Sequence, residues 1–249
     1  MSEVWLYSIL SVFIVSIVSL AGLFTLAIKM ERLKKILSYF VSFSAGTLFG
    51  DAFIHLLPEA VESYGFGLDI SLYLLSGVAL WFLIEKIVHW HHCHNPTCSE
   101  GVDTFAVMNL FGDTIHNIID GVIIGASYLV SIPLGIATTF AVFLHEIPQE
   151  ISDFGVLVKG GFSKKKALFY NFLTALASFI GLIFALVMGS RVEGFMVFVI
   201  PFAAGAFIYI AGADLIPELH KEVRIKRSIM QFIFFVAGIG VMVALLKFG

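Results

Sequence analysis

Long apolar runs dominate the chain, and short polar stretches separate them. Each run approaches the roughly 20 residues that an α-helix needs to cross a bilayer. Eight such segments are expected, at Val4–Ile28, Ile36–Leu57, Ile70–Val88, Phe105–Leu129, Pro133–Val158, Ala167–Met188, Phe195–Ile216 and Ile229–Leu246. They are predicted to be helices because backbone groups in hydrocarbon need partners within their own segment. The predicted fold class is an all-α polytopic membrane protein, with one transmembrane domain over residues 1–249.

The composition agrees with this pattern. The chain of 249 residues is 59% hydrophobic and 13% charged, whereas a soluble domain is about 25% charged. A soluble enzyme, a nucleic-acid binder and a disordered chain are therefore excluded, and no nucleic-acid partner is expected. Met1-Ser2-Glu3 has no basic region, so the first run is expected to be a retained span and not a removed signal peptide.

Positive charge predicts the orientation. With eight spans, 13 of the 15 Lys and Arg residues fall on one side of the membrane. Excess Lys and Arg marks the cytoplasmic side, so both termini are expected on the outer side of the membrane. The protein itself is expected in the cytoplasmic membrane of the cell. A loop at residues 89–104 then faces the cytoplasm. It carries zinc-ligand side chains that are either a metal acceptor or incidental: His89, His91, His92, Cys93, His94 and Cys98.

Two spans resemble each other in sequence. Residues 43–59 read FSAGTLFGDAFIHLLPE and residues 202–218 read FAAGAFIYIAGADLIPE, at a constant offset of 159. These spans cross the membrane in opposite directions in the predicted topology. The pattern predicts a 3+2+3 inverted repeat, in which the first three spans mirror the last three. Transporters of this architecture bind substrate near the midplane, at the interface of the repeats.

Ionisable residues concentrate on the fourth and fifth spans. Asp113, His116, Asn117 and Asp120 share one helix face through their spacing, and His145, Glu146, Gln149, Glu150 and Asp153 occupy two adjacent stripes. A turn near Val130–Pro133 makes the two spans antiparallel neighbours. His116 precedes Ser131 by 15 residues and His145 follows it by 14, so the histidines are expected at the same depth.

Imidazole, carboxylate and amide oxygen together suit Zn²⁺, Fe²⁺ or Mn²⁺. No Lys or Arg is predicted inside the fourth or fifth span to neutralise the carboxylates. We therefore expect a metal site here, with room for two adjacent ions, in preference to a polar helix seam. The candidate ligands are His116, Asn117, Asp120, His145, Glu146, Gln149 and Glu150. Pro148 either frees a carbonyl near Leu144 for a cation or water, or forms a packed kink.

Further polar residues are candidates for the pathway. Asp51 and His55 on the second span, and Asp214 on the seventh, are expected to line the entrance and exit together with Asp113 and Asp153. Alternatively, such polar residues lie at the ends of helices, where water solvates them and they have no role in transport.

The motifs HNIIDG, at His116–Gly121, and HEIPQE, at His145–Glu150, resemble those of the ZIP family of divalent-metal transporters. The likeness extends to GDAFIHLLPE, DFGVLVKGG, NFLTAL and the PE end of the seventh span. It implies eight spans, external termini, a homodimer and a binuclear centre. By this resemblance, one metal position is formed by His116, Asp120, His145 and Gln149. The other is formed by Asn117 and Glu146. At position 149 this chain has Gln, where the family usually has His or Glu.

The predicted function is import of a divalent metal, Zn²⁺ or else Fe²⁺, Mn²⁺ or Cd²⁺, as substrate and without a catalytic cofactor. An intramembrane zinc hydrolase is the first alternative, since HEIPQ is one residue short of HExxH. Gln149 breaks that motif, so no enzyme is expected. A passive metal channel or sensor is the second alternative.

Overall fold

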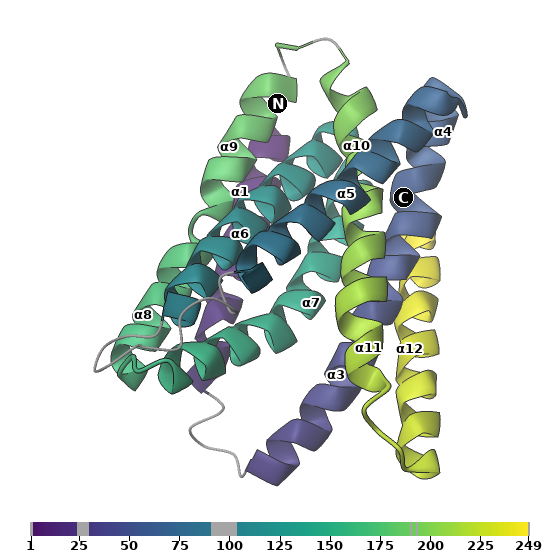
Figure 1. The fold of residues 1–249 in the computed structure, drawn as a ribbon. Coiled ribbons are helices and arrows are strands. Elements are labelled where there is room, and N and C mark those ends of the chain that lie inside the picture. The colour runs from purple at the N-terminus through teal and green to yellow at the C-terminus, as the bar shows by residue number, and fades with distance from the viewer. Residues whose placement is uncertain (1, 24–29, 91–103, 190, 193, 249) are drawn as a thin grey trace.

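The computed structural model describes residues 2–23, 30–90, 104–189, 191–192 and 194–248. Within these ranges the regular elements are all helical (Figure 1). The first part of the chain forms α1 (Ser2–Val18), the 3₁₀ turn η1 (Ser19–Leu23), α3 (Met30–Gly50), the π-helix η2 (Asp51–Leu56), α4 (Leu57–Tyr64) and α5 (Leu68–Trp90). The second part forms α6 (Thr104–Val130), α7 (Ile132–Lys159), α8 (Lys164–Ala175), α9 (Ser178–Gly189), α10 (Phe195–Tyr209), the π-helix η3 (Ile210–Leu215), α11 (Ile216–Leu219), α12 (Ile225–Leu245) and the 3₁₀ turn η4 (Leu246–Phe248).

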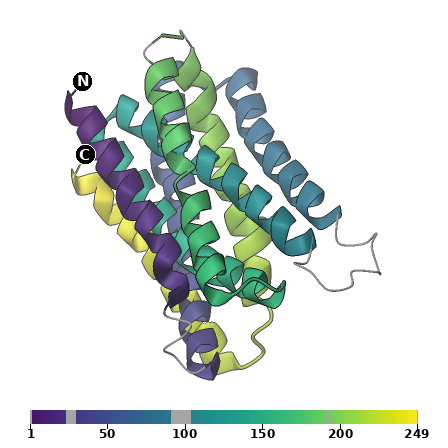
Figure 2. The same cartoon turned by 90° about the vertical axis from the view of Figure 1, so that its left-hand side faces the viewer.

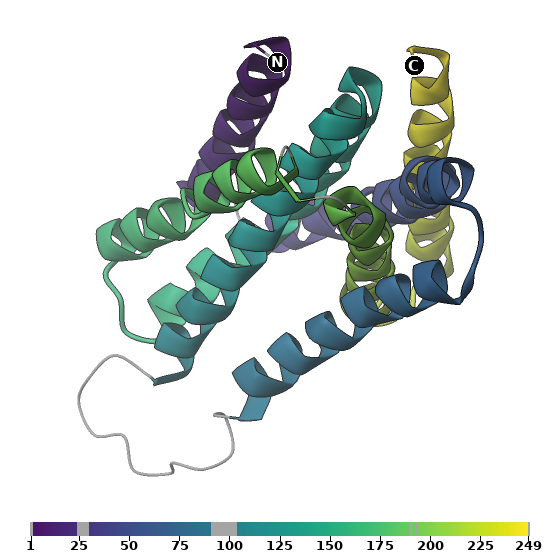
Figure 3. The ribbon, with the colours of Figure 1, turned by 90° about the horizontal axis from the view of Figure 1, so that it is seen from above.

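The helices form two groups that meet along α7. One group contains α1, α6, α7, α8 and α9, and its most extensive pairing is between α6 and α9. The other contains α3, α5, α10 and α12, in which α3 pairs with α12 and α5 with α10. Figure 3 shows α1 and α9 on one side of the molecule and α12 on the other. Contacts of α7 with α3 join the two groups, so α7 lies at their boundary.

Two helices contain π-helical turns at corresponding positions. The Leu57 N–H donates to Ala52 O in η2, and the Ile216 N–H donates to Ala211 O in η3. A proline follows each turn, Pro58 in α4 and Pro217 in α11. Proline lacks an N–H and its ring collides with the carbonyl four residues earlier, so the hydrogen-bond ladder loosens there. Both π turns lie inside segments that were expected to be regular helix.

Glycines bring two helix pairs into close contact. A Cβ on Gly46 of α3 would collide with the Phe235 carbonyl oxygen of α12. A Cβ on Gly205 of α10 would collide in the same way with the Leu74 carbonyl oxygen of α5. Small residues allow this approach of backbones, which contributes van der Waals contact between helices in lipid.

Six helical segments are long and apolar enough to cross a membrane among the residues described. They are Glu3–Leu23, Ile36–Tyr64, Leu68–Ile87, Lys164–Gly189, Phe195–Leu219 and Ile225–Leu245. Large apolar side chains such as Phe13, Phe82 and Phe232 are exposed on these helices, as expected for contact with lipid tails. The remaining two expected spans are α6 and α7, with 27 and 28 residues, and both carry the buried polar residues.

The described residues of the expected segments lie in helical elements, with two differences in detail. The segment Ala167–Met188 is broken between α8 and α9, at Leu176 and Ala177. At this break the Ser178 hydroxyl donates to the Ala175 carbonyl oxygen over 2.5 Å, in competition with the backbone ladder. The helix that contains the second segment also starts earlier than expected, at Met30.

Candidate metal centre

A tight hairpin places α6 against α7. Ser131 is the N-cap residue of α7, and its hydroxyl accepts a hydrogen bond from the Leu134 N–H at 3.2 Å. Pro133 occupies the first turn, where its missing N–H removes no helical hydrogen bond. The expected turn at Val130–Pro133 is confirmed. The two helices consequently run antiparallel from Ser131, and equal distances along them correspond to equal depths.

Four side chains from this hairpin converge on one point. One ligand atom from each of His116, Asp120, His145 and Glu146 lies within 4.8 Å of the other three. All four residues are buried, with relative exposures of 8%, 1%, 1% and 1%. We call them the histidine cluster. The His116 and His145 Nε2 atoms lie 3.1 Å apart, so the depth match expected from the sequence is confirmed.

The separations within the histidine cluster suit a small cation. His116 Nε2 lies 3.6 Å from Asp120 Oδ2 and 3.3 Å from Glu146 Oε1, and His145 Nε2 lies 3.3 and 3.4 Å from the same two oxygens. Zn²⁺ holds nitrogen and oxygen ligands at about 2.0–2.1 Å, so the edges of its tetrahedron measure about 3.3–3.4 Å. Five of the six ligand–ligand separations, at 3.1–3.6 Å, are therefore close to those of a four-coordinate zinc site.

The tautomer of His145 follows from its second contact. His145 Nδ1 lies 3.2 Å from the Ala141 carbonyl oxygen, which can only accept a hydrogen bond. Nδ1 therefore carries the proton, and in the neutral ring Nε2 presents its lone pair to the cluster. Ligating histidines usually donate their other ring N–H in this way, which fixes the ring and raises the basicity of the ligand.

Aromatic rings from the second group of helices close the site. The Trp81 ring of α5 packs edge-on against His116, with centroids 5.1 Å apart. The Phe207 ring of α10 packs edge-on against His145, with centroids 6.1 Å apart. Both aromatic side chains are buried, so they exclude water and lower the effective dielectric around the ligands.

The remaining polar residues of α6 and α7 lie beside the histidine cluster. Asn117 is buried and donates from Nδ2 to Asp113 Oδ1 at 3.0 Å. Asp153 Oδ1 accepts from Asn109 Nδ2 at 2.9 Å. Glu150 is 1% exposed, and Gln149 is half-buried. Among the described residues, the Lys and Arg ion pairs that involve Glu218 and Glu222 lie outside α6 and α7, so they do not neutralise the buried carboxylates.

The carbonyl released by Pro148 has a protein partner. Pro148 cannot donate to the Leu144 oxygen, and the Ser44 hydroxyl of α3 donates to it over 2.7 Å instead. Of the two alternatives raised by the sequence, this contact supports the packed kink and joins α3 to α7.

The other expected pathway residues lie apart from the histidine cluster. Asp51 is fully buried within η2, and neither carboxylate oxygen has a hydrogen-bond partner among the described residues. His55 Nε2 donates to the Met242 carbonyl oxygen at 2.9 Å, which ties η2 to α12. Asp214 is exposed in η3. Of the loop expected to face the cytoplasm, His89 belongs to the last turn of α5, whereas the other candidates lie outside the described residues: His91, His92, Cys93, His94 and Cys98.

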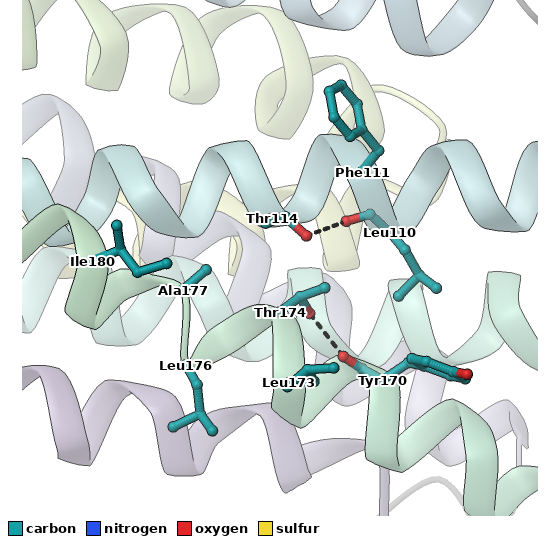
Figure 4. A pocket seen from close by; sticks show the side chains of 9 residues that line it. All are labelled: Leu110, Phe111, Thr114, Tyr170, Leu173, Thr174, Leu176, Ala177 and Ile180. Carbon is teal, nitrogen blue, oxygen red and sulfur yellow. Dashed lines mark hydrogen bonds between the residues drawn. The ribbon is translucent and has the colours of Figure 1, made fainter.

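An apolar groove of about 490 Å³ runs between α6 and the α8–α9 break (Figure 4). Its two threonines donate within their own helices, Thr114 to Leu110 O at 2.7 Å and Thr174 to Tyr170 O at 3.1 Å. The groove is therefore unsuited to a metal ion, and it does not include the histidine cluster.

Sequence reasoning missed four residues around the site: Trp81, Asn109, Asn171 and Phe207. Asn171 of α8 donates from Nδ2 to the Glu150 carbonyl oxygen at 3.0 Å. Asn109 and Asn171 interrupt apolar runs, which is a visible signal. Trp81 lies in the middle of a span, whereas tryptophan in membrane helices is typically found at the interface. Phe207 is one of 26 phenylalanines and carries no such signal.

The fold and the site define the class of the protein. It is an all-helical multi-pass membrane protein with a buried cluster of histidines and carboxylates. The chain matches a family model described as "ZIP Zinc transporter" over residues 2–102 and 91–246. The chain belongs to this family.

Individual relatives agree with this assignment. Metal cation symporter ZIP8 of Rattus norvegicus is 31% identical over 304 residues, which cover 90% of this chain and 65% of that protein. Zinc transporter zipt-7.1 of Caenorhabditis briggsae is 29% identical, with coverages of 96% and 78%. Zinc transporter ZIP13 of Pongo abelii is 31% identical, with coverages of 97% and 78%. These names describe transporters and not enzymes, and the chain spans about two thirds of the length of ZIP8.

Proposed function

We propose that the protein carries divalent transition-metal ions into the cytoplasm, with Zn²⁺ as the first substrate and Fe²⁺, Mn²⁺ and Cd²⁺ as alternatives. The observation that carries this proposal is the set of four buried ligand atoms from His116, Asp120, His145 and Glu146 within 4.8 Å of one another. One divalent ion balances the charges of Asp120 and Glu146. Names of the relatives, a metal cation symporter and two zinc transporters, support the same substrate class.

The proposed topology has eight spans, a 3+2+3 inverted repeat and external termini. The π turns η2 and η3 support the repeat, since they are separated by the same offset of 159 as the sequence match. The glycine contacts support it as well, because Gly46 and Gly205 occupy corresponding positions in the α3–α12 and α5–α10 pairs. Figure 2 supports the placement of both termini on one side, since α1 begins and α12 ends toward the same end of the bundle.

The basic residues support the inward direction. The beginnings of α3, α8 and α12, which lie in Lys- and Arg-containing segments, are found at the lower end of the molecule in Figure 1. That end is the proposed cytoplasmic face. The metal would approach from the side of the Ser131 turn and leave past Asp113 and Asp153. Asp51, His55 and Asp214 remain proposed pathway residues, and the loop at 89–104 remains a proposed metal acceptor.

A second metal beside the first is part of the proposal. The family resemblance assigns Glu146 and Asn117 to this second position, with Asp120 and Gln149 near both metals. In the structure Glu146 Oε1 lies with the two histidines, and the Asn117 amide nitrogen is directed at Asp113. This geometry supports Glu146 as a ligand of the first metal. A homodimer in the cell membrane stays a prediction from the resemblance.

Uptake of Zn²⁺ into proteoliposomes tests the function. Wild-type protein should accumulate Zn²⁺ along a gradient, and His116→Ala with His145→Ala should reduce uptake to that of protein-free vesicles. His220→Ala serves as the matched control, since it removes an exposed imidazole at the end of α11. Wild-type vesicles that move none of the four metals would overturn the proposal, and unchanged flux in the double variant would move the site elsewhere.

A further inference from the structure

Three carboxylates lie beyond the histidine cluster on the side away from the Ser131 turn. The contacts between His116 and His145 and between Asn109 and Asp153 determine the register of α6 against α7. Asp113 lies between Asn109 and His116 on α6, so it faces the turn of α7 that contains Glu150. At 1.5 Å per residue, Glu150 lies about 6 Å and Asp153 about 10 Å past Glu146 along the helix axis. We call Asp113, Glu150 and Asp153 the carboxylate cluster.

Each member of the carboxylate cluster has at least one unused oxygen. Asp113 Oδ2, Asp153 Oδ2 and both Glu150 oxygens are buried and lack a hydrogen-bond partner among the described residues. Asp113 and Glu150 are 5% and 1% exposed. The amide of Asn117 holds the other oxygen of Asp113, and the amide of Asn109 holds that of Asp153. Amide hydrogen bonds therefore orient two of the carboxylates, and one oxygen of each stays without a hydrogen-bond partner among the described residues.

The members of this cluster interact electrostatically with one another. Glu150 interacts with the charges of Asp113, Glu146 and Asp153, and Asp113 interacts with those of Asp153 and Glu146. A divalent ion in the histidine cluster is balanced by Asp120 and Glu146, so ionisation of Asp113, Glu150 and Asp153 calls for a second cation. Even one unpaired charge at the centre of a bilayer costs about 2.5–3.5 kcal/mol on insertion scales.

We propose that the carboxylate cluster is a second cation site, which binds a divalent ion through the oxygens of Asp113, Glu150 and Asp153. This inference rests on the proposed function, since the ion leaving the histidine cluster toward the cytoplasm would occupy this site next. Its donors are all oxygens, which suit Mn²⁺, Mg²⁺ and Ca²⁺, whereas the histidine cluster favours Zn²⁺. The site is distinct from a second metal held by Asn117 and Gln149, because three carboxylates supply the charge.

Binding stoichiometry tests this site without any measurement of transport. Full-length protein in lipid nanodiscs is equilibrated with Mn²⁺, and bound metal is counted by elemental analysis after dialysis. Wild type should bind one equivalent in each of the two clusters, in addition to any ion held by Asn117 and Gln149. The Asp113→Asn and Glu150→Gln protein should bind one equivalent fewer, because neutral isosteres remove two of the three charges. The His116→Ala and His145→Ala protein should retain the equivalent held by the carboxylate cluster.

Exposed carboxylates provide the matched control. Asp69→Asn with Glu62→Gln makes the same chemical changes at two exposed positions and should retain both equivalents. The same number of equivalents bound by wild type and by the Asp113→Asn and Glu150→Gln protein would overturn the second site. Failure of the proposed function is a separate outcome: wild-type vesicles that take up no metal would refute transport, while the loss of one equivalent would still support the site.

Discussion

The histidine cluster and the carboxylate cluster lie about one to two helical turns apart on the same hairpin, and they differ in almost every chemical respect. His116 and His145 contribute nitrogen donors at the first, with edges of 3.1–3.6 Å between the ligand atoms. Asp113, Glu150 and Asp153 contribute only oxygens at the second, and asparagine amides hold two of them.

This comparison separates two requirements of cation transport. Nitrogen donors at fixed spacing discriminate among metals, because borderline ions such as Zn²⁺ prefer imidazole. Oxygen donors without such spacing attract any divalent ion and discriminate less. A selective site followed by a less selective, strongly negative one would draw the ion forward without holding it for long. Ions must bind well enough to enter a site and weakly enough to leave it.

The largest expected difference between the clusters is in Zn²⁺ uptake. Glu146→Gln removes one charge from the selective site and should lower uptake at least about tenfold, since loss even of an outer-shell partner costs about 10–100-fold in affinity. Glu150→Gln makes the same chemical change about one turn away and should lower uptake less. Initial rates in proteoliposomes measure both. A larger loss in Glu150→Gln would reverse the assignment of the two clusters.

A smaller effect is expected at Gln149, on the helix between the two clusters. Gln149→His adds a nitrogen donor and should shift competition toward Zn²⁺ by several-fold, whereas Gln149→Glu adds a charge and should shift it toward Mn²⁺. Uptake of one labelled metal against a series of competitors measures the preference. Identical selectivity in the three proteins would place residue 149 outside the path.

The smallest expected effect concerns the support of α7. Ser44→Ala removes the hydrogen bond to the Leu144 carbonyl oxygen and leaves that buried group unpaired, at a cost of about 1–3 kcal/mol. Thermal unfolding in detergent should show a lower midpoint, while both Mn²⁺ equivalents remain bound. Loss of an equivalent in this variant would show that the Leu144 region contributes to a metal site and not only to packing.

Much of this arrangement could be predicted from the sequence, because its causes are local. Ser131 and Pro133 mark the turn, and helix geometry then brings His116 and His145 to the same depth. Apolar runs of the length of a bilayer predict the remaining helices. The proline and glutamate at the end of each repeated segment also predicted a relation between the second and seventh spans, which the paired π turns support.

Other features depend on contacts between distant segments. Pro58, Pro217 and Pro148 all interrupt a helical ladder, yet only the first two follow π turns, whereas Ser44 satisfies the carbonyl released by Pro148. The position of Glu146 beside the histidines depends on side-chain directions around α7, which sequence spacing does not determine. Trp81 and Phe207 pack against the site from other helices, so no local pattern could show which residues they contact.

X-ray absorption at the zinc edge, with one equivalent of Zn²⁺ bound to the protein in nanodiscs, tests whether His116, Asp120, His145 and Glu146 together bind the transported ion. We expect four nitrogen and oxygen neighbours at about 2.0–2.1 Å, with the outer-shell scattering of two imidazoles. The His116→Ala and His145→Ala protein should lack that outer-shell signal. A wild-type spectrum with oxygen neighbours and no imidazole contribution would show that the ion binds elsewhere.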